Sequence, residues 1–229
     1  LKLYPDVARP QRCFTLTSTH EMYGGAKGYY GQALSDNLFA QQRGCSYFAL
    51  AFGDWMIVGL DSAYYDPSNL YMEGGLGSNK DERQYDFLEQ VKRSGKKVIL
   101  MSHHTGMSND GAGPSKYLWH DVTSVLVPDY WYWGHVHLGA VYNSKSFASS
   151  THCRCIGHGA IPFASPPGMV GLDTVDWYSS AALISDPAED ALLSSSYRAK
   201  NGFALITLSK DGISEAVYNV GDSSPAWSS

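Results

Sequence analysis

The apolar positions of the first half of the chain fall into short continuous runs and one clear helical spacing. Residues 47–52 and 55–60 are two apolar runs joined by a Gly-Asp turn, which predicts a β-hairpin. Residues 81–94 carry apolar side chains every three or four positions, which predicts an amphipathic helix that ends at Gly95. Residues 96–101 follow as a continuous apolar run, the pattern of a strand buried on both faces of a sheet.

Five further segments have recognisable patterns. Residues 13–16 form a short β-prone run, so that His20 is expected on a loop at the end of a strand. Helices are predicted over residues 33–43, up to a glycine, and over residues 115–126. A short strand is predicted over residues 130–133, and a terminal hairpin is predicted near the carboxyl end of the chain, within residues 203–220.

The order of these elements is an alternation of strands and helices followed by extra strands, which predicts an α/β fold of layered β-sheets flanked by helices. No internal repeat, low-complexity tract or block of like charge marks a linker, so a single domain over residues 1–229 is expected. Residues 162–168 are rich in proline and predict an irregular loop.

Composition narrows the classes of partner. Hydrophobic residues make up 44 % of the chain and the formal net charge is −5, which disfavours a surface that neutralises many phosphates of a long nucleic acid. A small phosphate ester remains a possible substrate. No apolar run approaches the roughly 20 residues of a membrane span, so no membrane partner is expected. The four scattered cysteines favour reduced thiols and a cytoplasmic setting over a disulfide framework.

Histidines follow two of the predicted strands. His103 and His104 come directly after residues 96–101, and His135 and His137 follow residues 130–133. Imidazole is the commonest protein ligand of transition metals, and the carboxyl ends of strands are where open α/β sheets place such groups. In extended backbone His135 and His137 point the same way, which favours a metal site; two surface histidines on a strand are the alternative interpretation.

These motifs resemble those of the calcineurin-like metallophosphoesterase family, and they occur in the family's order. The family's Gly-Asn-His-Glu/Asp loop is matched in altered form by residues 18–21, Ser-Thr-His-Glu. Its His-His pair after a buried strand is matched by His103 and His104, and its Gly-His-x-His motif by residues 134–137. The resemblance extends from about Cys13 to Val220 and implies the layered α/β fold of that family.

The resemblance implies a role for each matching residue. His103 and His135 would bind one metal ion of a pair and His137 the other, the ions being divalent or trivalent and of the Mn, Fe or Zn class. His20 would donate a proton to the leaving alkoxide or hydrogen-bond the phosphoryl oxygens, and Glu21 would orient His20 and raise its basicity. The implied activity is metal-dependent hydrolysis of a phosphate mono- or diester, with a small phosphate ester as the partner.

The chain also departs from the family pattern. The family's Asp-x-His and Gly-Asp motifs, which supply ligands and a bridging aspartate, do not precede His20. Thr19 stands where the family has a metal-binding asparagine. Three neutral imidazoles without a carboxylate are expected to hold a metal pair weakly. A non-catalytic binding module of the same fold, which has lost the metal pair, is therefore the second hypothesis.

Two other clusters have competing interpretations. Residues 152–158 contain two histidines and two cysteines, which suggests zinc, but the spacing lacks a second ligand pair and favours ordinary alternating strand residues. Aromatic groups at residues 29–30, 64–65 and 131–133 would suit stacking of a base or sugar, although core and strand packing is the commoner reason for such groups. Neither cluster identifies a substrate.

Overall fold

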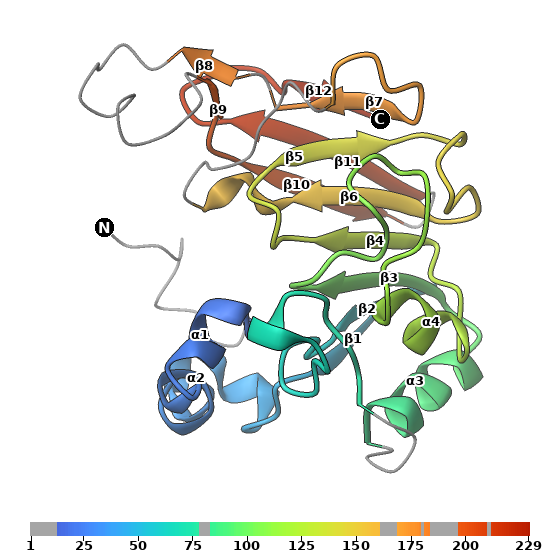
Figure 1. Ribbon diagram of the computed structural model, residues 1–229. Helices are drawn as coiled ribbons and strands as arrows, with labels where there is room; N and C mark the ends of the chain where they lie inside the picture. The colour runs from blue at the N-terminus through green and yellow to red at the C-terminus, as the bar shows by residue number, and fades with distance from the viewer. Residues whose placement is uncertain (1–12, 78–82, 161–168, 180, 184–196, 210–211) are drawn as a thin grey trace. The chain divides into compact units, whose positions relative to one another are not determined.

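The computed structural model of the chain consists of two compact units, each described here by itself (Figure 1). The first unit comprises Leu1–His104 and Lys116–Pro128, and the second comprises Thr105–Ser115 and Asp129–Ser229. The single domain predicted for the chain stays a prediction. The structure describes residues 13–77, 83–160, 169–179, 181–183, 197–209 and 212–229, so the loop predicted over residues 162–168 lies outside the described residues.

The strands of the first unit confirm the hairpin and the buried strand. Strands β1 (Phe48–Phe52) and β2 (Trp55–Gly59) pair antiparallel across the two-residue turn. Strand β3 (Lys97–Ser102) lies parallel to β2 on its other side. Val98, Ile99 and Leu100 are all buried, as expected for a strand covered on both faces.

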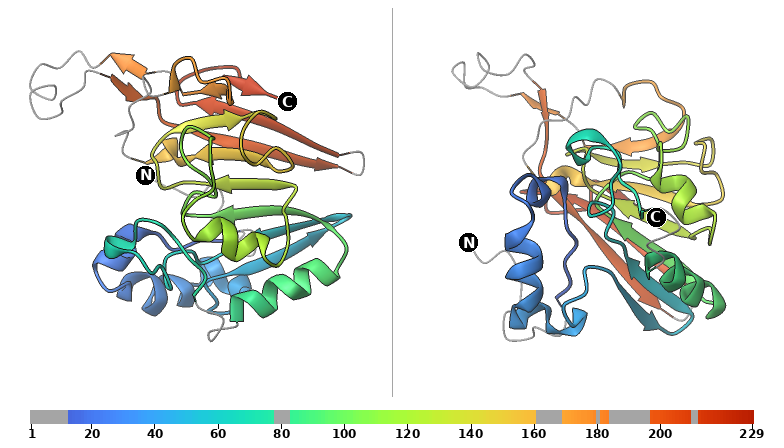
Figure 2. Two further views of the ribbon diagram at one scale, coloured as in Figure 1. Left: turned by 45° about the vertical axis from the view of Figure 1, so that its right-hand side comes forward. Right: turned by 60° about the horizontal axis from the view of Figure 1, so that its bottom comes forward.

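Helices lie on both sides of these strands (Figure 2). Helix α3 (Arg83–Arg93) confirms the predicted amphipathic helix and buries Leu88 and Val91, while its predicted start lies outside the described residues. Helix α4 (Leu118–Thr123) is shorter than the predicted 115–126. Helices α1 (Thr19–Tyr23) and α2 (Lys27–Gly31) lie on the opposite side of the strands.

The helix predicted over residues 33–43 is instead two short 3₁₀ helices, η2 (Ala33–Ser35) and η3 (Asn37–Gln42). Asp36 between them has an extended backbone, and its carboxylate accepts a hydrogen bond from the Leu38 N–H at 2.7 Å. This side chain caps η3 and ends η2, because an aspartate that bonds the backbone locally competes with a continuous helix.

The strand predicted over residues 13–16 is wrong, since this segment pairs with no strand of the described chain. A side chain instead makes the hydrogen bonds of the Thr15 backbone. The buried amide of Gln42 accepts from the Thr15 N–H at 2.7 Å and donates to the Thr15 carbonyl at 3.0 Å. The amide thus takes the place of a neighbouring strand.

The strands of the second unit are β4 (Tyr130–Trp133), β5 (Gly139–Tyr142), β6 (His152–Ile156), β7 (Val175–Tyr178), β10 (Gly202–Ser209), β11 (Gly212–Asn219) and β12 (Trp227–Ser228), with a separate pair β8 (Ala181–Leu183) and β9 (Tyr197–Ala199). In one of its two larger sheets β4 and β6 are parallel, and β5 pairs antiparallel with both β6 and β7. The other sheet is an antiparallel set in the order β10-β11-β12, which confirms the predicted terminal hairpin.

A buried ion pair joins the two larger sheets of the second unit. Arg154 on β6 donates through Nε and Nη2 to the two carboxylate oxygens of Glu215 on β11, each at 2.8 Å. The Tyr132 hydroxyl on β4 donates to the same carboxylate. All three residues are buried, so each charge is matched by hydrogen bonds inside the layered core.

Taken together, the described elements form a mixed α/β fold of layered sheets with helices outside, as the sequence predicts. No helix in the described residues is long and apolar enough to cross a membrane. The cysteines are Cys13, Cys45, Cys153 and Cys155, and all four are free thiols.

Candidate functional site

The motif at residues 18–21 begins a helix, not the open loop expected from the sequence. Ser18 is the N-cap of α1, and its hydroxyl accepts a hydrogen bond from the His20 N–H at 3.2 Å. The Glu21 carboxylate accepts from the Ser18 N–H at 2.8 Å and also bonds the Ser18 hydroxyl. Ser18 and Glu21 therefore form a capping box, which stabilises the first turn. The expected role of Glu21 in orienting His20 stays a prediction.

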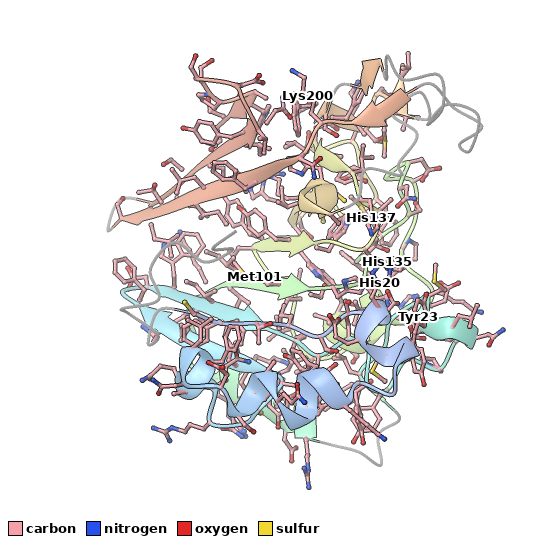
Figure 3. All side chains as sticks on the ribbon, turned by 90° about the vertical axis from the view of Figure 1, so that its left-hand side faces the viewer. His20, Tyr23, Met101, His135, His137 and Lys200 are labelled. Atoms are coloured by element: carbon pink, nitrogen blue, oxygen red, sulfur yellow. The ribbon has the colours of Figure 1, made fainter. Side chains whose placement is uncertain are left out.

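His20 lies on α1, where Figure 3 labels it, and is exposed. Its ring centroid lies 5.8 Å from that of Tyr23, one turn further along the helix. Tyr23 is 54 % exposed, and its hydroxyl contacts the sulfur of Met72 at 3.6 Å. An exposed imidazole on a capped helix is accessible to a substrate and fixed at its backbone.

Thr19 connects the motif at residues 18–21 to the His-His motif at His103 and His104. Its side chain is only 2 % exposed, and Oγ1 lies 3.1 Å from Nε2 of His103, a hydrogen-bond contact between residues 84 positions apart. His103 is half-buried directly after β3. The two motifs are thus neighbours within the first unit, and a hydroxyl holds one nitrogen of the predicted ligand.

The His104 side chain connects the end of β3 to the segment that follows β2 through hydrogen bonds. Its Nδ1 lies 2.9 Å from the Ser62 hydroxyl, and its Nε2 lies 2.8 Å from the Tyr71 carbonyl oxygen. Because a carbonyl can only accept, Nε2 carries the proton and Nδ1 accepts from Ser62. The side chain is fully buried, and burial lowers the pKa of His104. The ring stands nearly perpendicular to that of His103, at 84° with centroids 4.8 Å apart.

The loop that receives His104 has a strained backbone held by Asp66. Leu70 and Tyr71, in the 3₁₀ turn η4 (Asn69–Tyr71), have φ of 59° and 54°. The buried Asp66 carboxylate accepts N–H bonds from Ser68, Glu73 and Gly74 at 2.7, 3.1 and 2.7 Å. Left-handed non-glycine residues persist only where their surroundings hold them.

The sequence patterns described above predict neither this loop nor a function for His104. A local signal for the loop is Asp66-Pro67-Ser68, a typical start of a side-chain-capped turn. The contact of the loop with His104, in contrast, is tertiary. A Cβ on Gly74 would lie 2.5 Å from the His104 Cβ, so the loop passes directly over the imidazole.

The Gly-His-x-His motif of the second unit is a tight turn after β4. His135 and His137 both have φ of 54°, so the extended backbone expected from the sequence is wrong. The Val136 N–H donates to the Gly134 carbonyl at 2.6 Å, which closes the turn. Left-handed backbone at two non-glycine residues costs about 1–3 kcal/mol each. Strain of this kind concentrates at ligand and active sites.

Gly157 packs closely against the backbone of this turn. It begins the 3₁₀ turn η5 (Gly157–Gly159) after β6. A Cβ at Gly157 would lie 2.9 Å from both the Gly134 carbonyl oxygen and the His137 nitrogen. Only glycine fits in this space, so the close approach of η5 sets the position of the histidine turn.

The cluster at residues 152–158 has the character of strand residues. Cys153 and Cys155 point into the core from β6, and burial raises the pKa of their thiols to about 12 and about 11. The Cys155 thiol donates to the Leu138 carbonyl at 3.0 Å. His152 instead faces outward and stacks on Tyr130. Buried thiols with raised pKa values do not suit zinc, which binds thiolates.

The predicted ligands belong to both units. His103 lies in the first unit, and His135 and His137 lie in the second. Within their own units each follows the end of a strand, as expected. Their joint action on one metal ion stays a prediction.

Comparisons with known proteins give only distant likenesses. No family model matches the chain, and no curated protein matches it. Among solved structures, GAP50, the anchor in the inner membrane complex of Plasmodium, is 12 % identical, with a TM-score of 0.49 over 80 % of this chain. The purple acid phosphatase PPD1 from yellow lupin (Lupinus luteus) seeds is 13 % identical, with a TM-score of 0.43 over 81 % of this chain. The chain spans 52 % of the first and 32 % of the second.

Proposed function

We propose that this chain carries part of a metal-dependent phosphoesterase site, which hydrolyses a phosphate mono- or diester. The observation that supports the proposal most is the contact of Thr19 with His103 at 3.1 Å. It joins the Ser-Thr-His-Glu motif to the His-His motif, as a shared site in the first unit requires. Strain at His135 and His137 supports a functional role for the third motif independently.

His103, His135 and His137 would hold the metal. Neutral imidazoles suit ions of the Zn, Mn and Fe class, so the chemistry of these donors fits such an ion. The donors fit a metal pair less well, because they include no carboxylate to bridge two ions. When bound, a metal ion would polarise the phosphoryl group and lower the pKa of a coordinated water.

The chain's own residues would divide the remaining work. His20, exposed on α1, would protonate the leaving oxygen of the ester. Ser18 and Glu21 would fix α1 through the capping box, and Thr19 would hold His103 in position. His104 would fix the adjacent loop without touching the substrate, since both of its nitrogens are already hydrogen-bonded.

A non-catalytic module of the same fold is the second candidate function. The observation that favours it is the state of Thr19, whose hydroxyl is buried against His103 where the family has an asparagine ligand. In this hypothesis the histidine motifs preserve the fold and bind at most one metal ion. The two candidates differ in turnover, which makes them separable in one experiment.

The test is zinc and manganese titration by calorimetry together with hydrolysis of bis(p-nitrophenyl) phosphate. We expect one bound ion per chain and slow, metal-dependent hydrolysis. His103→Ala and His135→Ala should each weaken metal binding by at least about 10–100-fold, the loss caused by removing even a partner of a ligand. His152→Ala is the matched control, because its imidazole lies outward on β6.

Each outcome decides between the candidates. Metal binding with hydrolysis that His135→Ala abolishes supports the enzyme. Metal binding without hydrolysis supports the non-catalytic module. Binding that survives both alanine substitutions refutes the ligand assignment altogether.

A further inference from the structure

The first unit contains an aromatic cavity that the proposed reaction does not use. Its volume is about 370 Å³. The cavity is lined chiefly by Tyr30, Tyr47, Tyr64, Tyr65, Asp61 and Arg83. Its size falls in the range of small-molecule sites.

Neighbouring rings of this cavity stand edge to face and form no parallel stacking slot. Tyr30 and Tyr64 stand at 76° with centroids 5.3 Å apart, and Tyr64 and Tyr65 stand at 84° with centroids 4.7 Å apart. A flat base would need parallel faces, whereas perpendicular walls surround a compact, rounded group. Tyr64 is 51 % exposed, so its ring is accessible and not part of the closed core.

A buried carboxylate, that of Asp61, also lines this cavity. Asp61 is 2 % exposed and accepts three hydrogen bonds, from the Tyr30 hydroxyl at 2.6 Å and from the N–H groups of Ala63 and Tyr64 at 3.2 and 3.1 Å. These three donors share the two carboxylate oxygens of Asp61. Burial, followed by the Asp61 charge, raises the pKa of Tyr30, which keeps the phenol a neutral donor.

The second charge at the cavity is Arg83, and its setting differs from that of Asp61. Arg83 is exposed at the start of α3, so water and salt screen its charge. Asp61 is buried, so its charge is screened much less. The electrostatic potential inside the cavity is therefore set mainly by the Asp61 carboxylate and by the negative faces of the tyrosine rings.

We propose that this cavity binds a small organic cation with a methylated ammonium head group. Such a group is rounded, weakly hydrated and positive, and it is held by the faces of aromatic rings. The buried carboxylate supplies the opposite charge, and the cavity supplies the space. Binding here does not require the phosphoesterase function, since no residue of the histidine motifs lines the cavity.

The experiment compares two probes of the same shape. The 229-residue chain is titrated with choline and with its neutral isostere 3,3-dimethyl-1-butanol, and binding is followed by calorimetry without added metal. We expect saturable choline binding at least about tenfold tighter than binding of the isostere, because only the cation gains from the rings and the carboxylate. Equal binding of the two probes, or no saturable choline binding, would overturn the proposal.

Variants separate the two sources of attraction. Tyr64→Leu keeps the apolar bulk and removes a ring face, and Asp61→Asn keeps an acceptor and removes the charge. Each should weaken choline binding by about tenfold. Tyr23→Leu is the matched control, because Tyr23 is 54 % exposed, close to the value of Tyr64, and lies outside the cavity.

The Arg83→Gln variant is expected to change choline affinity in the opposite direction. Removing a like charge from the rim should tighten choline binding, whereas an anion site would lose affinity. Circular dichroism melting curves of every variant establish that it is folded before binding is compared. Undiminished choline binding in folded Tyr64→Leu, or weaker binding in Arg83→Gln, would contradict the proposed ligand class.

Discussion

Adding one methyl group at Gly157 tests whether η5 positions the histidine turn. The new Cβ would lie 2.9 Å from the Gly134 carbonyl oxygen and 2.9 Å from the His137 nitrogen, both backbone atoms. A Cβ atom essentially never approaches another heavy atom within 3.0 Å, and backbone cannot swing aside like the end of a side chain. We therefore expect Gly157→Ala to displace the turn and to destabilise the fold by about 1–3 kcal/mol, the usual cost of overpacking.

The neighbouring Gly159 provides a control in the same 3₁₀ turn. A Cβ there would have its nearest neighbour, the Gly202 carbonyl oxygen, at 3.4 Å. Urea unfolding followed by circular dichroism gives the free energy of unfolding for Gly157→Ala, Gly159→Ala and the parent chain. We expect Gly159→Ala to lie within about 0.5 kcal/mol of the parent.

Metal titration of the same variants gives a second measurement. If His137 binds metal from this turn, its displacement in Gly157→Ala should weaken metal binding, whereas Gly159→Ala should not. Equal unfolding free energies for the two variants would refute the claim that η5 sets the turn. A destabilised Gly157→Ala with unchanged metal affinity would keep the packing argument and reject His137 as a ligand.

Three further predictions concern the buried polar groups. Glu215→Gln leaves the Arg154 charge uncompensated in the core and should cost about 3–5 kcal/mol in urea unfolding, with a smaller loss contradicting a buried pair. Burial lowers the pKa of His104 in the folded chain below the unfolded value of about 6.5, so the folded chain holds this residue neutral. The contribution of neutral His104 to the stability of the fold is therefore fully present above about pH 6.5 and is lost as the pH falls. The free energy of unfolding should therefore fall by up to about 1.4 kcal/mol per pH unit below pH 6.5 on account of this residue, and the slope should flatten in His104→Gln. Gly74→Ala should destabilise by more than Gly25→Ala, because both have positive φ but only Gly74 would place its Cβ against His104, at 2.5 Å; equal melting temperatures would argue against that contact.

The sequence predicted those elements whose signals are local. The hairpin of β1 and β2, the buried strand β3 and the helix α3 all follow from apolar periodicity and turn residues, and each was confirmed. The capping box at α1 was equally local, since Ser18 and Glu21 stand three residues apart. The polar stretch that follows residues 13–16 predicts a loop there, whereas the capping box begins a helix.

Tertiary contacts decided the elements that the sequence did not predict. Residues 13–16 are β-prone, yet the Gln42 amide occupies the hydrogen bonds of Thr15 that a neighbouring strand would have made. The left-handed turn at His135 and His137 depends on Gly157, about twenty residues further along the chain. No local pattern encodes such a contact, and histidine is not a residue that favours positive φ strongly enough to predict it.

Backbone strain also bears on whether the histidine turn is functional or purely structural. Among the described residues, non-glycine positive φ occurs at Ala26, Arg43, Leu70, Tyr71, His135 and His137. Four of these six lie in the histidine turn or in the loop held by His104, so the strain is concentrated beside the candidate motifs. Glycine would relieve it at His135 and His137, since glycine adopts left-handed backbone without steric cost. A module that needed only the fold would gain stability from glycine there. The imidazoles at strained positions therefore favour a role that uses their nitrogens, which both the proposed enzyme and a metal-binding module require and a purely structural turn does not.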